Sequence, residues 1–244
     1  MIFSDTAYDG ELPGNVKIIN ISLRDVSDLA GYKMGYSIDI GYAYKLCDFK
    51  PAYGFIFSEY IKDYDFWGQS DIDVIYGDIQ GFITDEVLTE FDFISVRHDY
   101  TTGCFALYRN NALMNNIFRR SKDCRKVLTD SRYWGFDEFN FLHPLLSDGS
   151  SIFNFKTEIE TFTHIIKKAD MQKEIKAYFD FILLEGVPGR IKFNKGRIIY
   201  DNKVEAVLYH LFWLKKVYKP GLMERKIPDQ YYISPKRIYF KTFQ

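Results

Sequence analysis

The sequence predicts an α/β protein with a mostly parallel mixed sheet flanked by helices and an antiparallel C-terminal part. Two patterns lead to this fold class. Up to residue 146, short apolar runs alternate with amphipathic stretches, which is the order of strand–helix–strand units and therefore of parallel sheets. Residues 190–193 and 197–200 are instead two short runs around a loop that contains Gly196, which predicts an antiparallel hairpin.

The expected elements follow in chain order. Strands are expected at residues 15–21, 64–68 and 91–96, and helices at residues 23–29, 52–62, from 84, 110–120 and 137–146. Ser22 is a cap candidate for the first helix, and Pro51 stands where the first turn of a helix tolerates proline. Asp85 and Glu86 lie in the first turn of the third helix, where carboxylates complement the helix dipole.

The chain length bounds the domain organisation. A chain of 244 residues predicts a single domain over residues 1–244. Residues 218–244 are expected to form an irregular C-terminal extension, because Pro220, Gly221, Pro228 and Pro235 interrupt any regular element there.

The composition excludes one class of protein and leaves two interpretations of the aromatic residues open. A formal charge of −1 lacks the basic footprint of a general nucleic-acid binder. Aromatic residues make up 18% of the chain, which suits either a surface that stacks on sugars or bases, or a core filled with aromatic rings.

The N-terminus, the apolar runs and the cysteines indicate a reduced, cytosolic protein. Acidic residues from Asp5 onward exclude a signal peptide. The longest apolar stretch, residues 206–214, is too short to span a bilayer, so no transmembrane segment is expected. Cys47, Cys104 and Cys124 contain no CxxC pair, which argues against disulfides and against a structural zinc site.

Two Asp-x-Asp patterns occur, and their contexts differ. Asp63 and Asp65 lie where a helix passes into a strand, and are expected in a solvated turn. Asp71 and Asp73 follow the strand at residues 64–68, and residues two apart in extended chain project to the same side. Their oxygens would suit Mg²⁺ or Mn²⁺. The pattern alone leaves two interpretations open, a metal site and a solvated hairpin.

A longer set of residues resembles a known family. The motif Trp-Gly-x-x-Asp-x-Asp-x-x-x-Gly-Asp over residues 67–78, with residues 44–54, 109–111, 136–138 and 209–211, is similar to a bacterial glycosyltransferase-like family of capsular and surface polysaccharide synthesis. The resemblance covers most of the chain and implies the GT-A nucleotide-sugar transferase fold. The first strand and helix of that fold are expected to be missing, because the chain's first five residues resemble its second strand.

The resemblance implies a metal centre. Asp73 would bind a divalent cation, Mn²⁺ or Mg²⁺, and Asp71 would contact both the metal and the donor ribose. His210 is implied as the third metal ligand, and Lys215 as a contact to the donor diphosphate. A Lewis acid suits this chemistry because the leaving group is a charged nucleoside diphosphate. Taken by periodicity alone, His210 is instead a satisfied histidine on the apolar strand at residues 207–212.

Further residues have both an implied role and a simpler structural one. The resemblance implies that Asp137 and Glu138 face the acceptor and that one of them is the catalytic base. The simpler interpretation is that they cap a helix, because carboxylates at a helix start are most often caps. It makes Asp48 and Lys50 donor contacts, although an exposed lysine is usually only solvated. Asp78 is expected to be a helix cap or a turn residue.

The resemblance implies a metal-dependent glycosyltransferase. It would transfer a sugar from a nucleoside-diphosphate sugar, a UDP-sugar first of all, to a hydroxyl of a surface glycan or lipid-linked precursor. The expected location is the cytoplasm, or the inner face of the membrane as a peripheral protein. Two alternatives stay open: a non-catalytic carbohydrate-binding or scaffold protein, and a metal-dependent nucleotidyltransferase, whose chemistry also uses paired aspartates.

Overall fold

The computed structural model describes residues 1–146, 148–180, 182–219 and 228–240. The chain forms two compact units, each made from two separate stretches. The first unit is Met1–Trp67 with Asn110–Ala169, and the second is Gly68–Arg109 with Asp170–Gln244. The expected single domain over residues 1–244 stays a prediction.

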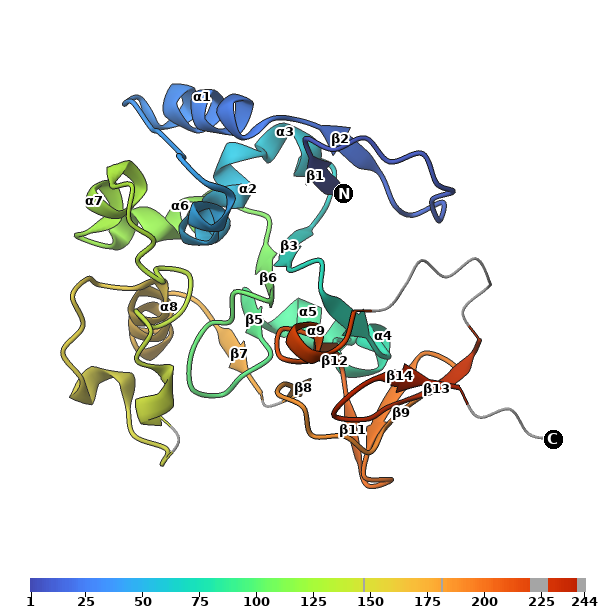
Figure 1. Ribbon diagram of the computed structural model, residues 1–244. Helices are drawn as coiled ribbons and strands as arrows, with labels where there is room; N and C mark the ends of the chain where they lie inside the picture. The colour runs from blue at the N-terminus through green and yellow to red at the C-terminus, as the bar shows by residue number, and fades with distance from the viewer. Residues whose placement is uncertain (147, 181, 220–227, 241–244) are drawn as a thin grey trace. The chain divides into compact units, whose positions relative to one another are not determined.

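The first unit begins with a pair of short strands and a capped helix, all labelled in Figure 1. β1 (Ile2–Ser4) and β2 (Ile18–Asn20) pair in parallel, and α1 (Leu23–Met34) follows β2 directly. The amide of Asp25 donates to the Ser22 hydroxyl, and the amide of Ser22 donates to the Asp25 carboxylate. This reciprocal capping box confirms Ser22 as the N-cap of α1.

The remaining elements of the first unit are short helical segments, with η marking a 3₁₀ helix. They are η1 (Ala43–Ala52), α2 (Tyr53–Ile56), α3 (Ser58–Ile61), α6 (Ala112–Asn116), η2 (Ile117–Arg120), α7 (Cys124–Thr129), η3 (His143–Leu146), η4 (Ile152–Asn154) and α8 (Phe162–Met171), whose end passes into the second unit. The helix expected over residues 52–62 is therefore divided into α2 and α3, and Pro51 lies inside η1. The helix expected over residues 110–120 is α6 continued by η2.

The helix expected over residues 137–146 is wrong. The chain makes turns from residue 136 to residue 141, and only the short η3 follows. Gly135, Asn140 and Phe141 have φ angles of +62°, +49° and +64°, in the left-handed region. A right-handed helix needs negative φ at every residue, so it cannot pass through this segment.

The second unit holds most of the described strands. They are β3 (Phe66–Ser70), which begins at the end of the first unit, β4 (Val74–Tyr76), β5 (Phe93–Ser95), β6 (Phe105–Arg109), β7 (Ala177–Phe179), β8 (Leu183–Leu184), β9 (Ile191–Asn194), β10 (Arg197–Tyr200), β11 (Val204–Ala206), β12 (Leu208–His210), β13 (Gln230–Ile233) and β14 (Ile238–Tyr239). Its described helices are α4 (Ile79–Phe82), α5 (Asp85–Glu90) and α9 (Leu214–Val217). The strands expected at residues 64–68 and 91–96 correspond to β3 and β5, and the helix expected from residue 84 is α5.

Most strand pairings in the second unit are antiparallel. β5 pairs with β6 and β4 with β12 in this orientation, and the hairpin β9–β10 is confirmed. Parallel pairing occurs between β5 and β7 and between β8 and β12. The protein is therefore α/β, as predicted, but with several sheets of mixed orientation, and the mostly parallel sheet is wrong. Parallel neighbours need a crossover of roughly a dozen or more residues, and residues 96–104 between β5 and β6 are fewer.

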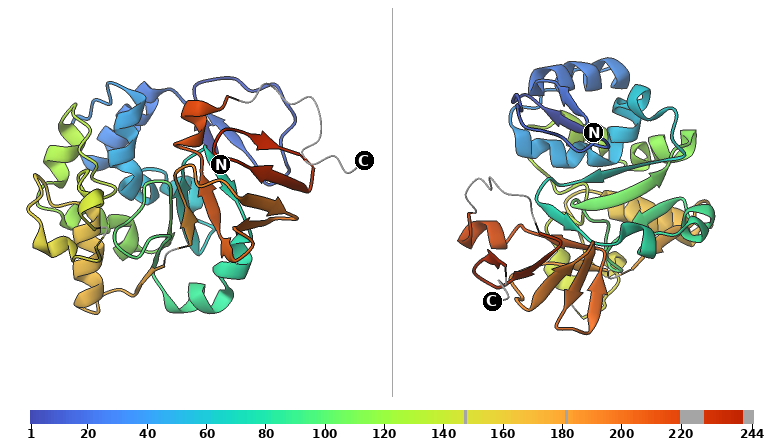
Figure 2. Two further views of the ribbon diagram at one scale, coloured as in Figure 1. Left: turned by 60° about the horizontal axis from the view of Figure 1, so that its bottom comes forward. Right: turned by 90° about the vertical axis from the view of Figure 1, so that its right-hand side faces the viewer.

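The expectation of an irregular segment from residue 218 is also wrong for the residues that the structure describes there. β13 pairs with β9 and β14 pairs with β13, completing a five-stranded sheet in the order β11-β10-β9-β13-β14 (Figure 2). Pro228 and Pro235 lie just outside β13, where proline removes no ladder hydrogen bond. Pro220 and Gly221 lie outside the described residues.

The three-stranded sheet β4-β12-β8 has a different apolar cluster on each of its faces. Leu208 belongs to the cluster shared with β5 and β6, whereas its neighbour Tyr209 belongs to the cluster shared with the five-stranded sheet. Successive residues of a strand point to opposite faces, so His210 lies on the same face as Leu208.

The aromatic residues divide between core and surface. Phe49, Phe93, Phe118, Phe136, Phe139 and Phe162 are completely buried, which supports the aromatic-core interpretation. Tyr42, Tyr44 and Tyr64 are exposed, so they are candidates for stacking on a sugar or a base. Among the described residues, no helix has both the length and the apolar character that crossing a bilayer requires.

Candidate metal centre

The three-stranded sheet brings three acidic or metal-ligating residues to one of its ends. Asp73 immediately precedes β4, and His210 is the last residue of β12, paired with Val74. β8 runs parallel to β12 with Leu184 opposite Tyr209, so Glu185 comes next to His210. The amide of Leu211 donates to the Asp73 carbonyl at 2.8 Å, which extends the β4–β12 ladder past the site.

Asp71, Asp73 and His210 converge within the second unit. The Nε2 atom of His210 lies 3.7 Å from Oδ2 of Asp71 and 3.7 Å from Oδ1 of Asp73. One ligand atom from each of the three residues lies within 4.8 Å of the others. The pairing of β4 with β12 therefore brings His210 next to aspartates that lie far from it in the sequence. Periodicity along the chain cannot predict such a contact.

Glu185 fixes the ring of His210. Nδ1 of His210 lies 2.9 Å from Oε1 of Glu185. Because a carboxylate oxygen accepts, Nδ1 is the donor in this contact, and in the neutral ring Nε2 then carries the lone pair, on the side of the aspartates. Burial lowers the pKa of His210, but the Glu185 hydrogen bond and the charges of Glu185, Asp73 and Asp71 outweigh it, so the pKa is raised. Arg97 reaches Glu185 at 3.9 Å.

Lys215 supplies a positive charge at the same place. Its Nζ lies 2.5 Å from Oδ2 of Asp73, and the residue sits in α9 just after β12. Burial raises the pKa of Asp73, but the Lys215 hydrogen bond and the charges of His210 and Lys215 reverse the sign, so the pKa is lowered. Asp73 therefore stays ionised. Lys216 instead lies 4.0 Å and 3.9 Å from the ring centres of Phe212 and Trp213.

Gly68, Gly77 and Asp78 of the twelve-residue motif have structural roles. A side chain at Gly68 would meet Leu107, and one at Gly77 would meet the carbonyl oxygen of Ala206, at 2.4 Å and 2.7 Å respectively. Both glycines therefore allow neighbouring backbone or side chains to approach closely. Asp78 caps α4, because its carboxylate accepts the Gly81 amide hydrogen bond.

The other Asp-x-Asp pair lies where the sequence predicts it. Asp63 and Asp65 are exposed in the turn between α3 and β3. This interpretation is confirmed, and the two residues are absent from the groups of the described chain that could hold a metal ion.

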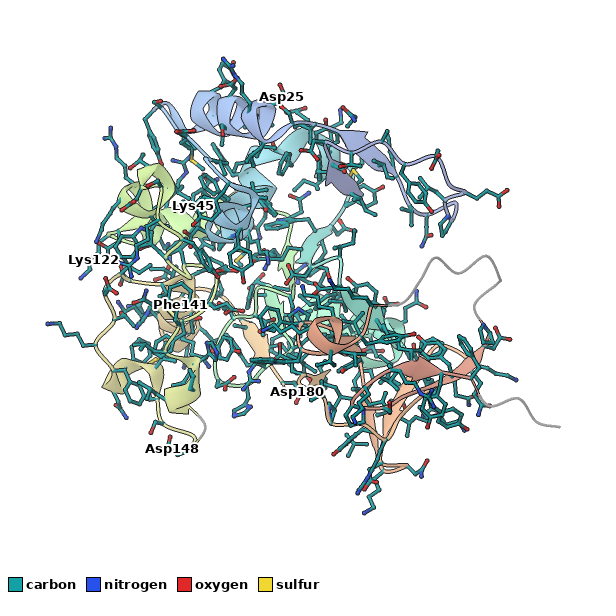
Figure 3. All side chains as sticks on the ribbon, viewed as in Figure 1. Asp25, Lys45, Lys122, Phe141, Asp148 and Asp180 are labelled. Atoms are coloured by element: carbon teal, nitrogen blue, oxygen red, sulfur yellow. The ribbon has the colours of Figure 1, made fainter. Side chains whose placement is uncertain are left out.

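Asp48 lies in the first unit and has a structural environment. Its side chain and that of Lys45 are 0% exposed, with Nζ of Lys45 2.8 Å from the Asp48 carboxylate. The amides of Trp134 and Phe136 donate to the two oxygens of Asp48 at 2.9 Å and 2.8 Å. Lys45 also donates to two backbone carbonyls, and Figure 3 labels it within this unit. The Asp48 carboxylate has no exposed surface, and its expected contact with the donor stays a prediction.

Lys50 and Asp137 also lie in the first unit and pair with each other. Nζ of Lys50 is 3.9 Å from Oδ2 of Asp137, which is 2% exposed, and the Tyr133 hydroxyl donates to Oδ1 at 3.3 Å. Lys50 is buried, so the solvated-lysine interpretation is wrong. Capping is wrong for Asp137 and Glu138, because no helix begins at residue 137. Glu138 is the more exposed of the two.

The base predicted from the resemblance stays a prediction, and Glu138→Gln tests it. If Glu138 takes the acceptor proton, the amide should lose turnover with donor affinity nearly unchanged. Steady-state rates and donor titrations on the same protein measure this. Asp137→Asn is measured in the same way for comparison. This variant should have a lower melting temperature than wild type, because Lys50 loses a buried carboxylate partner. A Glu138→Gln protein with the wild-type rate would exclude this residue as the base.

The donor set at Asp71, Asp73 and His210 fits a divalent cation. Carboxylate oxygens suit Mg²⁺ and Mn²⁺, and imidazole suits transition metals, so the combination favours Mn²⁺ over Mg²⁺. Glu185 adds the carboxylate–histidine contact that commonly orients such a ligand. Glu185 was not identified from the sequence. A signal was present, because Glu185 directly follows a short apolar run at residues 182–184, as Asp71 follows the apolar strand at residues 64–68.

These features define an α/β protein with a candidate divalent-metal site at the end of a mixed sheet. The chain belongs to a family of unknown function, DUF6625, whose model matches residues 1–242. Comparison with curated proteins and with solved structures gave no significant match to either.

Proposed function

We propose that the protein is a metal-dependent glycosyltransferase whose second unit binds a nucleoside-diphosphate sugar. The observation that carries the proposal is the convergence of Asp71, Asp73 and His210, with Lys215 against Asp73. The family resemblance of the motif at residues 67–78 adds to it. The GT-A fold and a cytoplasmic or membrane-peripheral location belong to the same proposal.

The charges at the site suit a diphosphate bound through a cation. When bound, the cation supplies Lewis-acid neutralisation of the charge that develops on the leaving diphosphate. Asp71 and Asp73 are half-buried carboxylates that hold it, and the lone pair of His210 Nε2 completes the set. Lys215 is half exposed, so its ammonium group can leave the Asp73 carboxylate and donate a hydrogen bond to a phosphate oxygen of the donor instead.

Nucleotide binding separates the proposal from a purely structural protein. A ligand that binds only the folded state raises the melting temperature, so a thermal-shift panel of nucleoside-diphosphate sugars should show shifts that require Mn²⁺. We expect UDP-sugars to shift the protein most. A panel without any Mn²⁺-dependent shift would contradict the proposal and favour a scaffold or carbohydrate-binding protein.

The reaction product separates the proposal from the nucleotidyltransferase alternative. A glycosyltransferase incubated with a UDP-sugar and Mn²⁺ releases UDP, with water or an acceptor hydroxyl receiving the sugar. A nucleotidyltransferase releases pyrophosphate from a nucleoside triphosphate. Detection of UDP but not pyrophosphate supports the first reaction class, and the reverse result contradicts it.

His210→Ala should weaken Mn²⁺ binding by at least the roughly 10–100-fold typical of losing support at a metal site, because a direct ligand is removed. Mn²⁺ titration of both proteins measures the change, with circular dichroism to show that the fold is kept. His143→Ala is the matched control, since His143 is exposed on η3 in the first unit. A folded His210→Ala protein that binds Mn²⁺ and UDP like wild type would remove His210 from the site.

A further inference from the structure

Cys104, Glu185 and His210 form a second ligand set beside the first. One ligand atom from each residue lies within 4.8 Å of the others. This set shares only His210 with the aspartate set. Glu185 lies against Nδ1 of His210, whereas Asp71 and Asp73 lie nearer Nε2, so a cation held with Glu185 would use Nδ1. We propose that these three residues bind a thiophilic divalent cation of the Zn²⁺ type, and that its binding excludes Mn²⁺ from the aspartate site.

The fold fixes the three ligands from three different strands of the second unit. Cys104 immediately precedes β6, Glu185 follows β8, and His210 ends β12. The Cys104 carbonyl accepts hydrogen bonds from the Asp71 amide at 3.1 Å and from the Ser70 hydroxyl at 3.0 Å. These hydrogen bonds join the backbone of Cys104 to the segment that contains Asp71 and Asp73.

The exposure of the set suits entry from one side. Cys104 is 4% exposed and packs in the apolar cluster of β5, β6 and β12. The side chain of Glu185 is 36% exposed, so a cation meets the glutamate first. A metal bound between a buried thiol and an exposed carboxylate would have protein ligands on its inner side. Water could bind it on the outer side.

The donor chemistry selects a different metal from that of the aspartates. Thiolate sulfur and imidazole nitrogen favour Zn²⁺ over Mn²⁺ and Mg²⁺, and one cysteine, one histidine and one glutamate are all established types of zinc ligand. Three protein ligands leave the fourth tetrahedral position for water, as in zinc sites that are not purely structural. The Cys104 thiol gives its proton to solvent as it binds.

His210 makes the two sites mutually exclusive. A neutral imidazole has one nitrogen with a lone pair and one that carries a proton. With the proton on Nδ1, held by Glu185, Nε2 is free to bind a cation beside Asp71 and Asp73. With a metal on Nδ1, the proton moves to Nε2, which becomes a donor toward the aspartates and can no longer bind Mn²⁺. Binding of one cation therefore lowers the affinity for the other.

The exclusion rests on the proposed function, whereas the thiophilic site does not. The consequence is that nucleotide binding would depend on which metal is present. A Zn²⁺-type cation bound to Cys104, Glu185 and His210 would inhibit Mn²⁺-dependent nucleotide binding without binding to the aspartates. By reciprocity of linked equilibria, Mn²⁺ would weaken zinc binding by the same factor.

Metal titrations of the full chain test the second site. Zn²⁺ affinity is measured by competition with a chromophoric chelator, and Co²⁺ in place of zinc gives a thiolate-to-cobalt charge-transfer absorption. Cys104→Ala should remove that absorption and weaken Zn²⁺ binding at least 10–100-fold, while Mn²⁺ binding persists. Cys124→Ala, at another buried cysteine, should change neither. Asp73→Asn should lose Mn²⁺ and keep Zn²⁺.

A second variant protects the test against misfolding of Cys104→Ala. Glu185→Gln changes an exposed side chain and can still accept the hydrogen bond from Nδ1, so the fold should persist while Zn²⁺ affinity falls. Wild-type Zn²⁺ affinity in both variants, or no thiolate–cobalt absorption in the wild-type protein, would overturn the thiophilic site.

Competition between the metals is the last readout. Zn²⁺ should displace Mn²⁺ from the wild-type protein at a lower concentration than from Cys104→Ala, in which zinc can compete only at the aspartate site. Simultaneous full binding of both cations would overturn the exclusion. Zinc binding through Cys104 in a protein that never binds Mn²⁺ would instead refute the proposed function and leave the thiophilic site standing.

Discussion

Asp73→Asn is expected to abolish Mn²⁺-dependent binding of UDP while the secondary structure stays unchanged. The substitution keeps the size of the side chain but removes the charge that faces His210 Nε2 at 3.7 Å and Lys215 at 2.5 Å. Loss of a direct ligand should cost at least the roughly 10–100-fold seen when even a supporting residue is lost. Calorimetric titration of UDP with and without Mn²⁺ measures the effect.

Asp63→Asn is the matched control for Asp73→Asn. It alters the other Asp-x-Asp pair, which is exposed in a turn, and should leave both Mn²⁺ and UDP affinities at their wild-type values. Equal losses in the two variants would point to a general charge effect. An Asp73→Asn protein with wild-type Mn²⁺-dependent binding would show that Asp73 is not a ligand.

Asp48→Ala is expected to destabilise the protein by about 3–5 kcal/mol, the usual cost of breaking a buried ion pair. The variant leaves the completely buried Lys45 ammonium group without its carboxylate, and two backbone amides lose their acceptor. Urea unfolding followed by circular dichroism measures the change in the free energy of unfolding.

Glu158→Ala is the control for Asp48→Ala. Glu158 pairs with Arg132 at 2.9 Å, but both side chains are about half exposed, so the loss of stability should be much smaller than for Asp48→Ala. Similar small losses in both variants would contradict a structural role for the buried pair. Wild-type stability of Asp48→Ala combined with lost UDP binding would instead restore the donor contact that burial argues against.

Local signals predicted the local elements. The start of α1 depends on Ser22 and Asp25, three residues apart, and the β9–β10 hairpin depends on one loop. Such features follow from contacts within a few residues, which the sequence displays directly. The missing helix at residues 137–146 shows the limit of this reasoning, because positive φ at Asn140 and Phe141 is not encoded by an apolar pattern.

The site was predicted in part, and what was missed is non-local. The motif predicted the convergence of Asp71 and Asp73, and the resemblance added His210 and Lys215. Glu185 was missed because it meets His210 only through the parallel pairing of β8 with β12. A predominantly parallel sheet was expected from strand–helix alternation, but short connections such as residues 96–104 make antiparallel neighbours instead.

The central claim is that Asp71, Asp73 and His210 hold a cation against a diphosphate. The most direct measurement is Mn²⁺ binding followed by electron paramagnetic resonance, in which the sharp signal of the free ion disappears on binding. We predict that the protein quenches this signal, that UDP tightens Mn²⁺ binding, and that Mn²⁺ tightens UDP binding by the same factor. A free-ion signal that the protein leaves unchanged, with or without UDP, would contradict the account.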